Sequence, residues 1–185
     1  RQVNVAITGG FNGIDFRDCD RHIIKRFVGC CLYNAMTVGG KDGLVEGCLQ
    51  NGNALCRMGL PAGIVSPVRE ADVFADVFDP ITRVQTEFLR IAAGSSGQTV
   101  CNTFAYGVKT FAAVYDSSAV LFNIGADNIG TSAPMLRLTG GETTVVNMLR
   151  YNGLSYELKN GSLRLYNRLT ISEKDERQHA VETPH

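Results

Sequence analysis

Carboxylates are the side chains of this sequence that could do chemistry, and three candidates among them lie in its first quarter. Asp15, Asp42 and Glu46 each lie in or beside a short apolar segment that glycine interrupts. Two carboxyl groups on one surface can act as a general acid and a general base, or can bind a hard cation such as Ca²⁺ together. We therefore predict Asp15 and Glu46 as an acid/base pair and Asp42 as a further catalytic candidate.

Three neighbouring side chains could hold a substrate. Arg17 follows Asp15 by two residues, which places both on the same side of an extended strand. Arg17 and Lys25 could contact a carboxylate of the substrate, and Tyr33 offers an aromatic ring against which it could stack. The structural alternative for each charged residue is a solvated strand face or a turn, where aspartate is common.

Other classes of site have little support in the sequence. The chain carries 18 basic and 18 acidic residues, and a zero net charge argues against a nucleic-acid partner. No apolar run has the length that a membrane span requires. The six cysteines form no CxxC pair, so a zinc site is poorly supported. The glycine-rich stretches lack the spacing of a phosphate loop or a nucleophile elbow.

The elements that must position these residues are short strands that recur along the chain. Alternating residues of 13–19 fall on opposite faces, as expected for a strand. Ile14 precedes Met36 by 22 positions, and Leu136 precedes Tyr156 by 20 positions. A repeat of about twenty residues is typical of a solenoid, in which each coil stacks its strands in parallel on the coil before.

Two more spacings extend the pattern between these stretches. Met36 precedes Leu55 by 19 positions, and Val28 precedes Val45 by 17. We expect the inward side chains to form apolar ladders. We expect asparagine and glycine at the corners, because corners need backbone conformations that these residues tolerate.

The middle of the chain interrupts the repeat. Residues 60–106 begin with a proline-containing stretch, and 73–78 have the spacing of one helical face, which Pro80 ends. We interpret 60–106 as an insertion at one corner that returns to the solenoid near Phe104. The domain then covers 1–171 and a polar tail covers 172–185. Because the chain begins with arginine inside a strand-like segment, we expect it to be part of a longer protein.

The stretch GIDFRDC, continued by FVGCCLYNAMTVGGKDGLVEGCLQNGNA, resembles the coils of pectate-lyase-like proteins. The resemblance covers about 1–60 and 107–171 and is a pattern of coils rather than of catalytic motifs. It implies an all-β, right-handed parallel β-helix, which is a single-stranded solenoid. The alternative is an antiparallel β-sandwich, which also consists of many short strands and turns.

The same resemblance implies a function directed at carbohydrates. The expected activity is that of a glycoside hydrolase, polysaccharide lyase or related transferase that acts on an oligo- or polysaccharide through carboxylates. No cofactor is expected, although a lyase could use Ca²⁺. The alternative is a non-catalytic solenoid such as a phage tailspike shaft, an adhesin or an assembly module. We expect an extracellular or periplasmic location and no membrane partner. We also expect either a homo-oligomer, for which a trimer is one option, or another chain that covers the N-terminal end.

Overall fold

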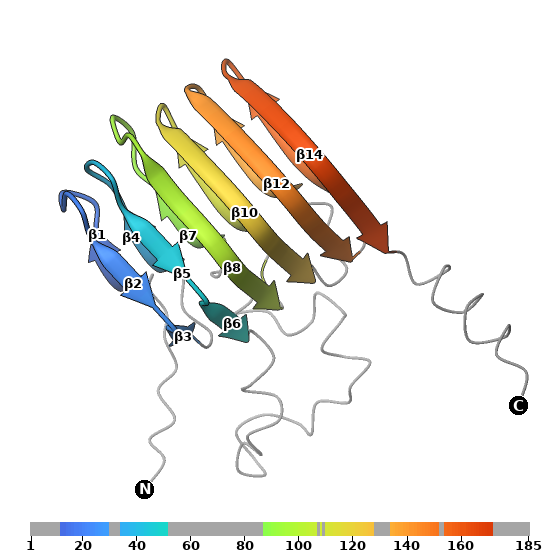
Figure 1. The fold of residues 1–185 in the computed structure, drawn as a ribbon, viewed down its shortest axis with the longest axis horizontal. Helices are drawn as coiled ribbons and strands as arrows, with labels where there is room; N and C mark the ends of the chain where they lie inside the picture. The colour runs from blue at the N-terminus through green and yellow to red at the C-terminus, as the bar shows by residue number, and fades with distance from the viewer. Residues whose placement is uncertain are drawn as a thin grey trace, which may run out of the picture.

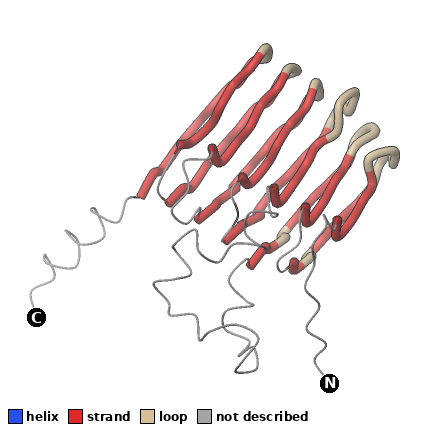
Figure 2. Tube along the Cα trace, turned by 180° about the vertical axis from the view of Figure 1, so that it is seen from behind, coloured by secondary structure: helices blue, strands red, loops and turns tan. Residues whose placement is uncertain are grey.

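A computed structural model describes residues 12–29, 34–51, 87–106, 108, 110–127, 134–151 and 154–171, and these residues form strands and turns without a helix (Figure 2). Six of these ranges each contain one coil of the chain, and each coil contributes to two parallel sheets. Within the described residues, no helix has the length and apolar character to cross a membrane.

The first sheet, called sheet A here, has one short strand from each coil. Its strands are β1 (Asn12–Phe16), β4 (Asn34–Val38), β7 (Glu87–Ile91), β9 (Thr110–Tyr115), β11 (Pro134–Thr139) and β13 (Leu154–Lys159), in that spatial order. Every neighbouring pair is parallel. Consecutive coils therefore stack side by side, as Figure 1 shows.

The second sheet, called sheet B, holds the other half of each coil. In the first two coils this half is divided into β2 (Ile23–Lys25) with β3 (Val28–Gly29), and β5 (Leu44–Glu46) with β6 (Leu49–Asn51). In the later coils it is one long strand: β8 (Gln98–Tyr106), β10 (Ser118–Asp127), β12 (Glu142–Tyr151) and β14 (Ser162–Ile171). These strands are also parallel, so the chain is a parallel β-solenoid consistent with a β-helix, and the antiparallel sandwich is excluded.

The core lies between the two sheets and consists of ladders of equivalent side chains. In sheet A one ladder is Met36, Leu89, Ala112 and Leu136, and in sheet B another is Ile24, Val45, Val100, Leu121 and Val145; all are buried. Burial of each large aliphatic side chain stabilises the fold by about 1.5–3 kcal/mol. Because every coil repeats the same inward positions, the register of one coil on the next determines the core.

Tight turns join the two sheets along one edge of the solenoid (Figures 1 and 2). Gly40, Gly140 and Gly141 have positive φ there, and Gly141 lies directly against the backbone of the previous coil. A Cβ on Gly141 would lie 2.1 Å from the carbonyl oxygen of Ser117. The turn therefore needs glycine for both its backbone conformation and the close approach of two coils.

The structure confirms the long-range repeat and corrects part of its register. Ile14 pairs with Met36, and Leu136 pairs with Tyr156, as the spacing predicts. Met36, however, pairs with Leu89 and not with Leu55. The physical reason is that the next coil begins only after residues 52–86, so the nearest apolar residue at the right spacing is not its true neighbour.

Two further expectations about the repeat differ from the structure. Val28 pairs with Leu49 rather than Val45, because the left-handed residue Arg26 divides this half of the first coil into two strands. The chain returns to the solenoid at Glu87 and not near Phe104, since 87–106 already form β7 and β8. The predicted helical face at 73–78 lies outside the described residues, as does the tail at 172–185.

Replacing Gly141 by alanine should destabilise the protein strongly. Positive φ costs a residue with a Cβ about 1–2 kcal/mol, and the collision with the Ser117 backbone adds further strain that no side-chain rotation can relieve. The measurement is the free energy of unfolding in urea.

Gly94→Ala is the matched control, because Gly94 also has positive φ but a Cβ there would meet nothing within 4 Å. The free energy of unfolding of this variant should fall only by the cost of placing alanine at positive φ. Equal losses for the two variants would show that close contact between coils at the turn contributes nothing.

Candidate functional site

The structure does not bring the predicted acid/base pair together. Asp15 lies in β1 of sheet A, whereas Glu46 lies in β5 of sheet B. Arg17 donates from Nε to Asp15 at 2.9 Å, and Lys25 Nζ lies 2.9 Å from Glu46 Oε2. The hydrogen bond from Arg17 is the main reason why the pKa of Asp15 lies below its ordinary value. Each carboxylate is thus engaged with a cation close to it in its own half of the coil.

The remaining predicted residues do not complete this pair. Asp42 lies in a tight turn with φ of 55°, and its backbone N–H donates to the Ser96 carbonyl at 2.9 Å. This placement fits a turn residue. Tyr33 lies outside the described residues. Among the predicted residues, the structure therefore pairs Asp15 with Arg17 and Glu46 with Lys25. The two ion pairs lie in different halves of the coils and do not form one site.

The groove of the described surface lies on the outer face of sheet B. It has a volume of about 630 Å³ and crosses β8, β10, β12 and β14. Its lining residues are Asn102, Thr103, Phe104, Asn123, Ile124, Gly125, Asn147, Met148, Leu149, Asn167, Arg168 and Leu169. The lining combines amide groups with apolar side chains and includes one charged residue, Arg168.

A ladder of four asparagines runs along this groove. Asn123 donates from Nδ2 to Asn102 Oδ1 at 3.1 Å, and Asn147 donates to Asn123 at 2.8 Å. Asn167 continues the series by donating to Asn147 at 3.0 Å. All four asparagines are exposed, so their amide groups face solvent as well as one another.

The backbone explains why asparagine occupies these positions. The four residues have φ between 49° and 57°, a left-handed conformation that asparagine tolerates better than most residues. The equivalent positions of the first two coils are Arg26 and Gly47, which also have positive φ. Each coil thus bends at the same level of sheet B, and the bend turns the asparagine side chains outward into one row.

Asparagine occurs at a corner, as expected, at Asn160 between β13 and β14, but the four asparagines of the ladder lie elsewhere. They lie inside the long strands β8, β10, β12 and β14 of sheet B. The available signal was a recurring pattern of an apolar or cysteine residue, asparagine, any residue, and then an apolar residue or glycine: CNTF, FNIG, VNML and YNRL. An asparagine within an otherwise strand-like run is in this fold a bend at positive φ.

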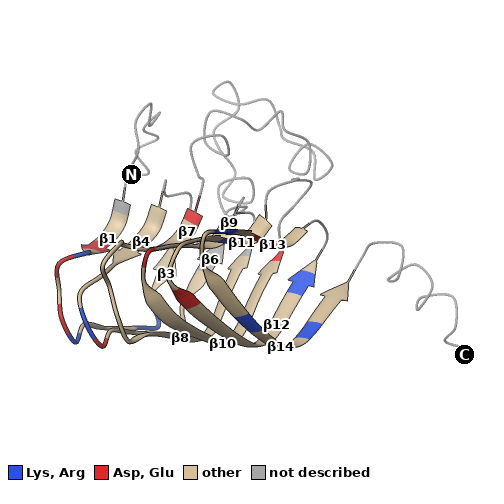
Figure 3. Ribbon diagram, turned by 90° about the horizontal axis from the view of Figure 1, so that it is seen from above, with Lys and Arg blue, Asp and Glu red and all other residues tan. Residues whose placement is uncertain are grey.

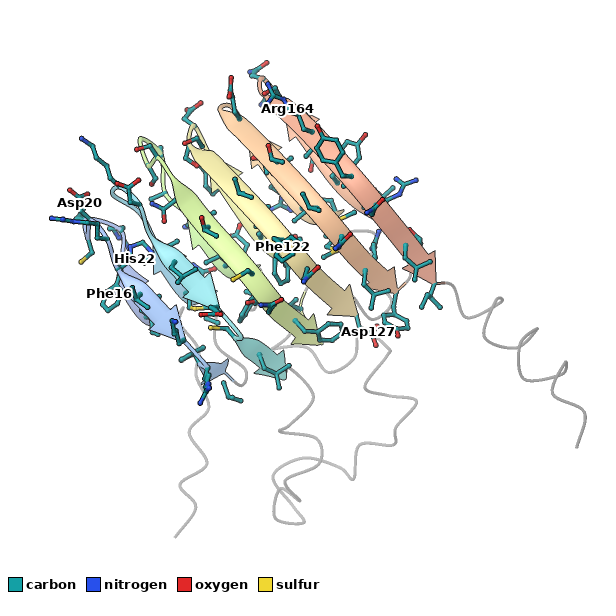
Figure 4. The ribbon with its side chains drawn as sticks, in the orientation of Figure 1. Phe16, Asp20, His22, Phe122, Asp127 and Arg164 are labelled. Atoms are coloured by element: carbon teal, nitrogen blue, oxygen red, sulfur yellow. The ribbon has the colours of Figure 1, made fainter. Side chains whose placement is uncertain are left out.

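Apolar side chains border the asparagine row on the same face. Phe104 lies over Gly125, where a Cβ would come within 2.5 Å of the ring, so the missing side chain makes room for the ring. The exposed large apolar residues of sheet B are Ile23, Val28, Leu49, Val120, Phe122, Tyr166 and Leu169. Phe122 is visible on β10 in Figure 4. Large exposed apolar patches of this kind mark binding surfaces.

A second polar group lies on sheet A and has a structural role in the described residues. The Glu87 carboxylate is buried and accepts from Arg90 Nε at 2.8 Å and from the Tyr115 hydroxyl at 3.3 Å. Arg137 Nη1 lies 3.6 Å from the same carboxylate. Burial, with a smaller contribution from Glu87, raises the pKa of Tyr115. Glu87 is thus saturated by donors from three neighbouring strands and ties these coils together.

The described residues offer neither a metal site nor an activated thiol. No cluster of three His, Cys, Asp or Glu side chains that could hold a metal ion occurs among the described residues. Cys48 is buried and Cys101 is partly buried, and burial raises the pKa of both thiols. A raised pKa disfavours the reactive thiolate. The site that the structure offers is therefore the amide-lined groove of sheet B.

Comparison with known proteins gives no relative for this chain: no family model, no curated protein and no solved structure matches it.

Asn147→Ala should destabilise the protein by about 3–4 kcal/mol. The change removes two ladder hydrogen bonds, each worth about 1 kcal/mol, and places alanine at positive φ. Asn147→Gly removes the same hydrogen bonds without the backbone strain, so it should lose less. Urea unfolding of both variants separates the two contributions, and a smaller loss for alanine than for glycine would contradict the assignment.

Gly47→Asn should extend the ladder by one rung and stabilise the protein by about 0.5–1 kcal/mol. Gly47 is level with Asn102, has φ of 63°, and a Cβ there would meet nothing within 4 Å. The new side chain can accept a hydrogen bond from Asn102, at the typical net gain of one such bond. A lower unfolding midpoint than that of the parent protein would show that the ladder does not favour extension.

Proposed function

We propose that this chain is a non-catalytic β-solenoid module that binds an extended, neutral glycan along the outer face of sheet B. The observation that carries the proposal is the groove of about 630 Å³, whose floor is a row of asparagine amides and whose sides are apolar. Amides can donate to and accept from sugar hydroxyls, while apolar and aromatic side chains pack against the C–H faces of the rings.

The repeat of the groove suits a repeating ligand. Neighbouring strands of a sheet lie about 4.8 Å apart, so the asparagine row presents a similar amide at each such step. An extended polysaccharide advances by a similar length for each sugar residue. A chain lying across the strands could therefore meet the same contacts on each coil.

The composition of the groove favours binding over cleavage. Glycoside hydrolysis needs two carboxyl groups on either side of one bond, and no carboxylate is among the residues that line the groove. Two of the predicted acids, Asp15 and Glu46, lie in different sheets and are paired with Arg17 and Lys25. Arg168 is the one charged residue of the lining, and its register with the buried Met148 places its side chain on the inward row, so a neutral glycan suits the groove better than a highly charged one.

Phe104→Ala should weaken glycan binding at least about tenfold, the equivalent of about 1.4 kcal/mol, because it removes the aromatic side chain seated over Gly125. The measurement is retardation in native gels that contain neutral polysaccharides, followed by calorimetry with oligosaccharides of the polysaccharide that retards the protein. Incubation should leave the length of the glycan unchanged.

Phe16→Ala is the matched control, since Phe16 is an exposed aromatic residue at 38 % on the first strand of sheet A. It should bind like the parent protein. Absence of retardation by every neutral polysaccharide, or an equal loss in both variants, would reject the proposal. Release of shortened glycan by the parent protein would instead restore the enzymatic alternative.

A further inference from the structure

Arg150 is a fully buried cation without a hydrogen-bond partner. Its side chain is 0 % exposed, and Nε, Nη1 and Nη2 all lack an acceptor. Arginine remains protonated in proteins, so this side chain brings a full positive charge and five N–H donors into the interior. A buried charge without a partner is strongly unfavourable. Something that the described residues do not supply must compensate it.

The register places Arg150 on the inward face near the C-terminal end of the solenoid. Arg150 pairs with Ala126 of the previous coil, which pairs with Ala105, and both alanines belong to the core. Two small residues in the same row leave space in the interior beside the long arginine side chain. Arg150 is two residues after the buried Met148 and therefore shares its face of β12.

The last described coil adds polar groups on the same face. Thr170 pairs with Arg150, and Arg168 pairs with Met148, so Arg168 and Thr170 continue the inward rows of β12 onto β14. Both are exposed, because β14 is the last strand of sheet B in the described residues. Figure 3 shows the positive charge on β12 and β14. One hydroxyl and two guanidinium groups are thus placed on neighbouring strands.

The described acids near this end do not neutralise the two arginines. Burial alone lowers the pKa of Arg150 to about 10, with no contribution from a neighbouring charge. Asp127 follows Ala126 and, by strand alternation, lies on the opposite face; Figure 4 shows it at the end of β10. Arg150 is thus left without a compensating charge or acceptor among the described residues.

We propose that Arg150, Arg168 and Thr170 form a binding site for a small oxyanion, either a tetrahedral ion such as sulfate or phosphate or a carboxylate. Guanidinium groups bind such oxygens through paired, charge-assisted hydrogen bonds, and the threonine hydroxyl can donate one more. The anion supplies the missing acceptors of Arg150 and joins the last two described coils. The site uses the interior face of sheet B and does not depend on glycan binding in the outer groove.

The test is thermal unfolding of the whole chain in sodium sulfate, sodium acetate and sodium chloride at equal ionic strength, without glycan. A ligand that binds only the folded state raises the melting temperature with the logarithm of its concentration. We expect sulfate or acetate to raise it above the value in chloride, and the more effective ion identifies the preferred oxyanion. Arg150→Met and Arg168→Met should each lose this difference in whole or in large part.

Arg164→Met is the matched control, because Arg164 lies in the same strand β14 and is exposed, but pairs with Thr144 on the outward row. It should keep the full difference between the anions. If Arg150→Met does not fold, Arg168→Met and broadening of the ³¹P signal of inorganic phosphate by the parent protein decide the question. Equal melting temperatures in all three salts, or equal losses in Arg164→Met and Arg168→Met, would overturn the proposal.

Discussion

The structure depends on one constraint: every coil bends at the same level of sheet B through a residue in the left-handed conformation. In four coils this residue is asparagine, and the side chains of these residues are linked by hydrogen bonds of 2.8–3.1 Å. The bend and the ladder support each other, because the shared conformation aligns the amides and the amide hydrogen bonds hold the coils in register. A shift of one residue would turn core side chains toward solvent.

That register divides the functions of the two faces of sheet B. Its inward rows hold the ladder from Ile24 to Val145 and supply the stability of the core. Its outward rows hold the amides, Phe104 and other apolar side chains, which are not needed for that core and form the groove. Where an inward row carries arginine instead of an apolar residue, as at Arg150, the same geometry creates a site that needs an anion.

The charged residues show how much of the site could be inferred from local sequence. The nearness of Asp15 and Arg17 followed from strand alternation, and the structure shows them joined. The proposed partnership of Asp15 with Glu46 required knowing which half of a coil each residue occupies. A short apolar run does not reveal which sheet its strand belongs to, since strands of sheet A and of sheet B show the same alternation of apolar and polar residues. The two acids were therefore predicted on one surface although they lie on opposite sheets.

The sequence by itself determined the class of fold, because stacked parallel coils require apolar residues to return at a nearly constant interval, and Ile14 with Met36 and Leu136 with Tyr156 preserve it. Only the tertiary structure decided which coil follows Met36, since residues 52–86 separate neighbours that pair as Met36 with Leu89. It also decided that asparagines within strands form a ladder and that Arg150 points inward. These outcomes depend on contacts between residues about twenty or more positions apart, and one strand read alone contains no information about the strand that lies beside it.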